Sequence, residues 1–278
     1  MTKVYVFPGQ GSQALGMGNE LFDKFSFLIK QADAILGYSI KQLCLEDPNK
    51  KLNSTDYTQP AIYVINALSY LKKVQQSGKP DFVAGHSLGE YNALFAAEVF
   101  DFATGLKLVQ KRGAIMAKAE GGGMAAVIGL EPEKIQEVLT NMGINTIDIA
   151  NYNSPSQTVI SGLKADIQKL TGVFEKAGAK LFISLPVSGA FHSRYMKPAK
   201  EEFEKFLGQF TLKAPKIPVI ANYTAKKYED NAIKETLAPQ ICNPVRWVET
   251  IRFLKQQPEP VFEEVGPGKV LTKLIAQI

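Results

Sequence analysis

The chain has 278 residues, of which 45% are hydrophobic and 21% are charged, values typical of an ordinary globular protein. Lysine and arginine exceed aspartate and glutamate by only 32 to 27, which is too small an excess to indicate nucleic-acid binding. No apolar run approaches the roughly 20 residues that span a bilayer, and the N-terminus does not resemble a signal peptide, so we expect a cytoplasmic protein without a membrane partner.

The predicted elements alternate between strands and helices, which is typical of an α/β fold. Residues 4–7 form a short buried strand, and the apolar spacing of residues 21–29 predicts a helix. A second buried strand, at residues 82–84, runs through a sharp turn directly into a helix. The other helices expected in this part of the chain cover residues 59–76, 90–99 and 101–119.

From residue 124 to residue 187 the order changes to strand, helix, strand, strand, helix and strand, which is the order of a ferredoxin-like module. We therefore predict a catalytic domain of residues 1–123 and 192–278, interrupted by a ferredoxin-like insert of residues 124–191. The cleft between the two is the expected ligand site. The remaining predicted elements are helices at residues 132–142, 165–177, 198–207 and 247–256, strands at 146–152, 157–161, 180–187 and 218–222, and a last strand and helix within 261–278.

The turn after the second strand, Gly85-His86-Ser87-Leu88-Gly89, fits the nucleophile-elbow pattern G-x-S-x-G. In such an elbow the serine occupies a strained turn that glycine neighbours make possible, and the helix N-terminus offers amide donors to developing negative charge. Five-residue matches also arise by chance, so a structural turn serine is the alternative. The strand before the turn and the helix after it favour Ser87 as a nucleophile.

A serine nucleophile needs a general base, and the chain has only two histidines. His86 adjoins Ser87, so its side chain should project away from the nucleophile and pack or hydrogen-bond elsewhere. His192 is then the candidate base, and it follows Ser87 in the order of nucleophile-elbow folds. Asp148 and Asp166 fall between the pair but inside the insert, so a backbone carbonyl that orients the imidazole is a fair alternative, and we expect a dyad.

The glycine-rich loop at residues 7–13 follows the first strand and is placed to bring a second amide to an oxyanion. A phosphate loop is excluded, because Gly11 and Gly16 have the right spacing but Met17 replaces the required lysine. A simple glycine-rich turn remains the other interpretation of this loop.

Six segments, spread over nearly the whole chain, share their order and spacing with one enzyme family. They are Gly9–Gln13, Gly85–Glu90, Arg112, Phe191–Ser193, Asn243–Trp247 and Gly266–Gly268. Together they resemble the malonyl-CoA:acyl carrier protein transacylase family. Three segments are more similar to the free-standing, trans-acting acyltransferases of polyketide synthases than to members of fatty-acid synthesis: Tyr57–Pro60, Asn66–Tyr70 and Val187–His192. The resemblance implies an α/β-hydrolase-like large domain that carries the ferredoxin-like insert.

The resemblance also implies site roles. Ser87 would be the acylated serine and His192 its base, with the backbone amides of Gln10 and Leu88 forming the oxyanion hole. Arg112 would pair with the free carboxylate of the malonyl group, which a planar guanidinium matches bidentately.

Two further residues would line the acyl pocket. Phe191, directly before the histidine, resembles the malonyl-selective form of the family, in which a bulky ring leaves little room for an α-methyl branch. Met116, one helical turn beyond Arg112, would line the same pocket, although core packing explains it nearly as well. A backbone carbonyl near residues 243–247 would orient His192.

The implied reaction is a ping-pong transfer from malonyl-CoA to Ser87 and then to the phosphopantetheine thiol of an acyl carrier protein. We expect no metal and no bound cofactor, since the phosphopantetheine belongs to the partner, and Cys44 and Cys242 have no metal or redox spacing. Carrier proteins are typically acidic, which predicts a basic rim beside the site. We expect a monomer and no nucleic-acid partner.

Three alternatives to polyketide-linked malonyl transfer remain. An acyl-thioester hydrolase uses the same serine and histidine but tends to lack the arginine. The fatty-acid-synthesis transacylase shares the chemistry and differs in its carrier. A non-catalytic module that only docks a carrier protein would not need an intact set of Ser87, His192 and Arg112.

Overall fold

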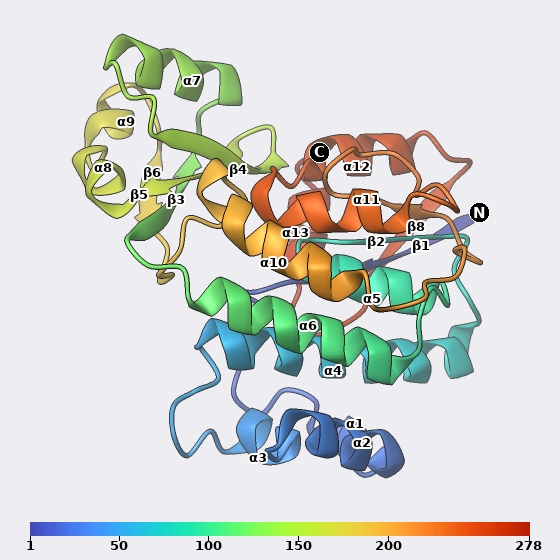
Figure 1. Cartoon of the computed structure of the whole chain (residues 1–278). Helices are drawn as coiled ribbons and strands as arrows, with labels where there is room; N and C mark the ends of the chain where they lie inside the picture. Colours follow the sequence, from blue (N-terminus) through green and yellow to red (C-terminus); the bar gives the residue numbers. More distant parts are fainter.

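The computed structural model describes residues 1–278 and contains two sheets, each with its own helices (Figure 1). The larger sheet is parallel and has the strand order β7-β2-β1-β8. None of the helices combines the length and the apolar character that a membrane span requires. The strands of the larger sheet are β1 (Thr2–Phe7), β2 (Phe82–Gly85), β7 (Val219–Ile220) and β8 (Pro260–Glu264).

β1 lies within the larger sheet and is buried on both faces. Val4 and Val6 point into one apolar cluster with Trp247, while Tyr5 and Phe7 point into the main core on the other face. Successive strand residues face opposite sides, so both faces of this sheet must be covered by helices. The helices of this domain are α1 (Asn19–Phe22), α2 (Ser26–Leu36), α3 (Ile40–Leu45), α4 (Thr55–Ser77), α5 (Gly89–Ala96), α6 (Phe102–Ala117), α10 (Lys197–Leu207), α11 (Ile233–Leu237), α12 (Trp247–Lys255) and α13 (Val270–Ile275), with the 3-10 helices η1 (Arg194–Met196) and η2 (Ala238–Cys242).

The smaller sheet is antiparallel, with the order β4-β5-β3-β6, and lies at one end of the molecule (Figure 1). Its helices bury a separate core that includes Ile135, Leu139 and Phe174. The sequence of elements and the strand order are those of the predicted ferredoxin-like module. The elements are β3 (Gly122–Ile128), α7 (Pro132–Asn141), β4 (Ile147–Ser154), β5 (Gln157–Leu163), α8 (Lys164–Lys169), α9 (Val173–Lys176) and β6 (Leu181–Ser184).

Main-chain hydrogen bonds join the smaller sheet to the larger domain. The amide of Tyr152 donates to the carbonyl of Val245 at 2.9 Å, and the amide of Val245 donates to the carbonyl of Ala150 at 2.8 Å. The chain also enters and leaves the insert at a close contact, because a Cβ on Gly122 would lie 2.1 Å from the amide nitrogen of Ala190. The insert was predicted to start at residue 124. This position lies inside β3, which begins two residues earlier at Gly122.

Four predicted elements differ most from the observed ones. The strand over residues 180–187 is shortened to β6. The helix over residues 21–29 is divided into α1 and α2, because Phe25 has φ −116° and ψ 37°, outside the helical region. The helix over residues 165–177 is divided at Gly172, which adopts a left-handed conformation with φ 78°. The strand over residues 218–222 is shortened to β7, and the chain then bends so that the side chain of Asn222 reaches the elbow.

Candidate active site

Ser87 lies on the turn between β2 and α5, with a φ of 50° that non-glycine residues rarely adopt. The flanking glycines are required by close backbone contacts. A Cβ on Gly85 would lie 1.9 Å from the carbonyl carbon of Gly89, and a Cβ on Gly89 would lie 2.0 Å from the carbonyl oxygen of Phe7. The side chain of Asn222 holds the turn, accepting from the amide of Ser87 and donating to the carbonyl of Gly85, both at 2.6 Å. The local sequence thus forms the elbow that it predicts.

The structure brings His192 to Ser87, with 2.7 Å between the histidine Nε2 and the serine Oγ. His192 Nδ1 lies 2.8 Å from the carbonyl oxygen of Gln240 and 3.2 Å from that of Asn243. Carbonyl oxygens only accept, so Nδ1 carries the proton and Nε2 is free to accept from the serine hydroxyl. Burial, together with the nearby Arg112 guanidinium, lowers the pKa of His192 to about 3, which keeps the imidazole neutral.

No carboxylate orients His192. Asp148 pairs with Arg194 outside the site, and Asp166 accepts from Thr146 and Lys169. The carbonyl interpretation therefore matches the geometry. The nearest carbonyl, that of Gln240, lies just before the predicted segment 243–247, and the carbonyl of Asn243 within that segment is the second acceptor.

His86 has the structural role expected from the sequence. Its Nε2 lies 2.8 Å from Oδ1 of Asn153, and its ring packs edge-on against Trp247 with 5.4 Å between the centroids. Burial lowers its pKa, so this imidazole is also neutral.

Two backbone amides near the elbow have no hydrogen-bond partner. The N–H groups of Gln10 and Leu88 donate to no other backbone group, whereas the amide of Ser87 is occupied by Asn222. The loop that carries Gln10 approaches the elbow closely, because a Cβ on Gly9 would lie 2.4 Å from the carbonyl oxygen of His86. The amide of Leu88, one residue after the serine at the start of α5, is available to an oxyanion, and the amide of Gln10 is the candidate for a second donor.

Arg112 is a buried cation in contact with the nucleophile. Only 1% of its surface is exposed, and its Nη2 donates to Ser87 Oγ at 3.1 Å. Its other acceptors are the side-chain oxygens of Gln240, at 2.9 Å, and Gln59, at 2.7 Å. No carboxylate contacts the guanidinium, and Nε, although buried, has no partner. A buried cation without a bound anion is costly, so this site favours a negatively charged ligand group.

Met116 lies beside this arginine network, and Phe191 lies in the same main core. The Met116 sulfur accepts from Gln59 Nε2 at 3.4 Å, so it touches the residue that holds Arg112. Phe191 is buried directly before His192, and its ring packs against Gly189.

Four polar residues to which the sequence assigned no role complete the site. Gln59 and Gln240 hold Arg112, Asn222 holds the elbow, and Glu90 is the only fully buried carboxylate. Burial raises the pKa of Glu90 to about 7, although the hydrogen bonds from Tyr228, Gln240 and Asn222 oppose this rise. Glutamine and asparagine are usually exposed, so only their burial marks them as functional.

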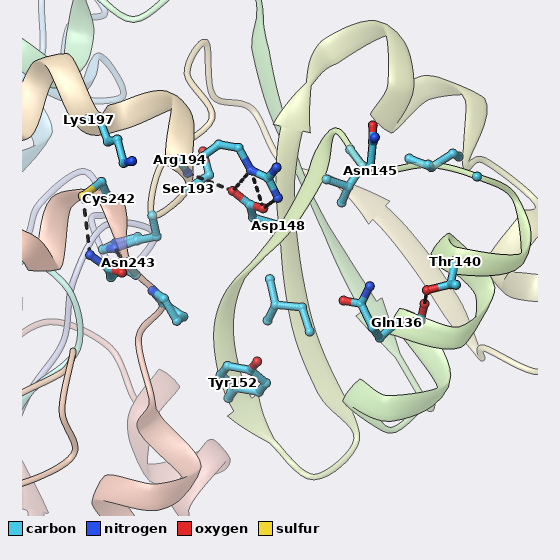
Figure 2. Close-up of a pocket in the computed structure, with 16 residues that line it drawn as sticks. Gln136, Thr140, Asn145, Asp148, Tyr152, Ser193, Arg194, Lys197, Cys242 and Asn243 are labelled. Atoms are coloured by element: carbon cyan, nitrogen blue, oxygen red, sulfur yellow. Dashed lines mark hydrogen bonds and ion pairs between the residues drawn. The ribbon is translucent and has the colours of Figure 1, made fainter.

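The site opens into a cavity of about 750 Å³ between the two domains. His192, Cys242 and Asn243 border it from the larger domain, while β4 and α7 form the opposite wall (Figure 2). Arg194 and Asp148 form an ion pair across it, and Lys197 points toward it (Figure 2). Ser87 does not line this cavity directly. A smaller cavity of about 140 Å³ reaches Gln10 and His86 on the other side of the elbow.

An elbow serine paired with a histidine, in an α/β chain with an antiparallel insert, is the arrangement of enzymes that transfer acyl groups through a serine ester. The acyl transferase domain family matches residues 4–277, and the chain belongs to this family.

Among curated relatives, the chain is 58% identical over 276 residues to the polyketide biosynthesis malonyl CoA-acyl carrier protein transacylase PksC of Bacillus subtilis, covering 99% of this chain and 96% of that protein. It is 39% identical to the malonyl CoA-acyl carrier protein transacylase of Escherichia coli, covering 99% and 92%. Among solved structures, a malonyl CoA-acyl carrier protein transacylase from Burkholderia pseudomallei is 48% identical with a TM-score of 0.97, covering 100% and 97%. These likenesses agree with the predicted family and fold.

Proposed function

We propose that this chain transfers a malonyl group from malonyl-CoA to the phosphopantetheine thiol of an acyl carrier protein, through an ester on Ser87. The names of the relatives support this activity, and the polyketide transacylase at 58% identity supports a polyketide pathway over fatty-acid synthesis. A further solved structure, of a malonyl-transacylase in complex with a type II polyketide acyl carrier protein, is 37% identical with a TM-score of 0.94, covering 100% of this chain and 93% of that one.

The observation that carries the proposal is the contact between a buried arginine and the nucleophile, 3.1 Å from Arg112 Nη2 to Ser87 Oγ. A serine that accepts only neutral acyl groups has no use for a desolvated cation at this distance. A carboxylate on the acyl group would supply the missing anion and accept bidentately from the guanidinium. Met116 and Phe191 would form the apolar part of the same acyl pocket.

In the first half-reaction, Ser87 Oγ attacks the thioester carbonyl while its proton passes to His192 Nε2. The amides of Gln10 and Leu88 would stabilise the oxyanion. The carbon–sulfur bond then breaks, and the imidazolium returns the proton to the thiolate of coenzyme A, which leaves as the thiol.

In the second half-reaction, the carrier's phosphopantetheine thiol gives its proton to His192, and its sulfur attacks the ester carbonyl. The carbon–oxygen bond breaks and Ser87 recovers the proton. Side chains and backbone amides perform every step, so the proposal invokes no metal or resident cofactor. We further propose a cytoplasmic monomer, in which the unpaired thiols of Cys44 and Cys242 stay reduced.

Hydrolysis is the second candidate, because the same serine and histidine would release malonate if water replaced the carrier thiol. Arg112 favours a carboxylated acyl group in either case, so the fate of the acyl group must be measured. A module that only docks a carrier protein would not form the ester at all.

The test is intact-mass spectrometry of the wild type and Ser87→Ala after incubation with malonyl-CoA, followed by a phosphopantetheinylated carrier protein. We expect a malonyl adduct on the wild type alone, which then appears on the carrier. Free malonate with an unloaded carrier would favour the hydrolase. The absence of any adduct would reject the serine-ester mechanism.

A further inference from the structure

The interior of the larger domain contains one buried carboxylate, Glu90, and one buried guanidinium, Arg112, that do not touch. The side chain of Gln240 lies between them. Its Oε1 accepts from Arg112 Nη2 at 2.9 Å, and its Nε2 donates to Glu90 Oε2 at 2.6 Å. Nε2 also donates to the carbonyl of Ser87 at 2.7 Å. Both amide protons and the amide oxygen of Gln240 are therefore in use.

Three donors fix the orientation of the Glu90 carboxylate. Besides Gln240 Nε2 at one oxygen, the hydroxyl of Tyr228 at 2.6 Å and the amide of Asn222 at 3.1 Å donate to the other. An oxygen that faces a backbone N–H must accept, and so must one that faces an amide NH2. Glu90 and the carbonyl of Ser87 together determine which end of the Gln240 amide points toward Arg112.

We propose that Glu90 is a positioning residue for acyl selection: it orients the Gln240 amide, which fixes the Arg112 guanidinium beside Ser87 and leaves its remaining donors open to the carboxylate of the acyl group. This inference rests on the proposed function. A direct ion pair with Glu90 would satisfy Arg112 but would occupy the donors that the acyl carboxylate requires. With the Gln240 amide between them, Glu90 supplies a negative charge near Arg112, and Gln240 Oε1 supplies the acceptor. The remaining guanidinium donors then stay available to the acyl carboxylate.

The test is Glu90→Gln, which keeps size and shape but turns one acceptor into a donor. The oxygen that faces Tyr228 and Asn222 must stay an oxygen, so the new NH2 group meets Gln240 Nε2. Gln240 then has no orientation that satisfies all its neighbours. Unrotated, its Nε2 meets the new NH2 group; rotated, it directs its NH2 group at Arg112 and its oxygen at the carbonyl of Ser87. We expect kcat/KM for malonyl-CoA to fall more than about ten-fold, while serine acylation by acetyl-CoA, whose acyl group has no carboxylate, changes less than about three-fold.

Tyr228→Phe is the matched control, because it removes a hydrogen bond to Glu90 without placing a donor against Gln240 Nε2. That hydrogen bond also lowers the pKa of Glu90, so the comparison is made well above pH 7, where the carboxyl group is ionised in both proteins. We expect the malonyl-to-acetyl ratio of this variant to equal that of the wild type. In the Arg112→Ala background, Glu90→Gln should have no further effect on the ratio, since both changes act through one guanidinium.

A purely structural Glu90 would lower the malonyl and acetyl rates together, and that result would overturn the inference. An unchanged ratio in Glu90→Gln would do the same. If Glu90→Gln does not fold, as judged by its melting temperature, Gln240→Glu carries the test, because a carboxylate in direct contact with Arg112 should abolish the malonyl preference. If the wild type has no malonyl preference and Arg112→Ala leaves the ratio unchanged, the proposed function fails instead.

Discussion

At the residue scale, the chemistry depends on two nitrogen atoms that lie beside one serine oxygen. Ser87 Oγ has His192 Nε2 at 2.7 Å and Arg112 Nη2 at 3.1 Å. One neighbour is a neutral base and the other is a permanent cation, so the same oxygen is prepared for deprotonation and for a substrate that brings a negative charge. The cation also disfavours a protonated His192, and a bound carboxylate would relieve this effect.

We predict that Arg112→Ala lowers kcat/KM for malonyl-CoA by roughly 100-fold or more, the order expected for a lost charge-assisted, bidentate pair. Acylation by acetyl-CoA should be retained or increased. The measurement is the acylation rate of Ser87 with each thioester, with Arg252→Ala, a substitution on the exterior of α12, as the control. Equal losses for both thioesters would show that Arg112 acts on the serine and not on the acyl carboxylate.

At the element scale, β1, β2 and α5 meet so closely that side chains are excluded. Gly89 begins α5 directly against the carbonyl of Phe7, the last residue of β1. This contact sets the sharp turn at Ser87 and brings the loop after β1 to the nucleophile. The elbow is therefore a property of three elements together.

We predict that Gly89→Ala destabilises the protein by about 3 kcal/mol or more, because the new Cβ would meet backbone that cannot move aside. Gly208→Ala, at the exposed end of α10, is the control and should change stability little. Urea unfolding of both variants measures the effect. A Gly89→Ala variant with wild-type stability and acylation would contradict the packing argument.

At the scale of the whole molecule, the cavity between the two domains gives access to His192. The wall of this cavity carries Lys197, a lysine without an ion-pair partner (Figure 2). We predict that Lys197→Glu raises the KM for an acidic carrier protein several-fold, an effect that salt should weaken. The measurement is transfer from the preformed malonyl-enzyme, which removes coenzyme A from the assay. Lys107→Glu, exposed on α6, should leave this KM unchanged, and equal effects of the two variants would reject a local basic rim.

The buried neutral histidine also makes folding depend on pH. The folded-state pKa of His192, about 3, lies below its ordinary value of 6.5, so the unfolded chain binds a proton that the folded chain does not. Stability contributed by this residue is present above pH 6.5 and is lost as the pH falls from 6.5 toward 3.

Relative to His192→Gln, which cannot titrate, the wild type should lose about 2 kcal/mol of unfolding free energy between pH 7 and pH 5. Urea unfolding at both pH values measures this difference. Glu90 acts in the opposite direction, since its raised pKa favours the folded state at low pH, but it is present in both proteins and cancels. A constant difference between the two proteins would show that His192 remains accessible to protons.

The sequence alone determined the fold class, the elbow and the candidate nucleophile and base, because these depend on local signals. Apolar runs define β1 and β2, small residues mark the turn at Ser87, and two histidines leave few choices for a base. The sequence predicted the βαββαβ order of the insert for the same reason, although it missed the break at Gly172.

Only the tertiary structure decided which groups support the site. The carbonyl of Gln240 orients His192, and the side chain of Asn222 holds the elbow. Glu90 is connected to Arg112 by hydrogen bonds through the side-chain amide of Gln240. Gln240 and Asn222 lie more than a hundred positions from the elbow in the sequence. Glu90 lies in a helix whose sequence pattern gives no sign of a special role. Burial gives a polar side chain a fixed partner, and burial results from long-range packing that no local pattern records.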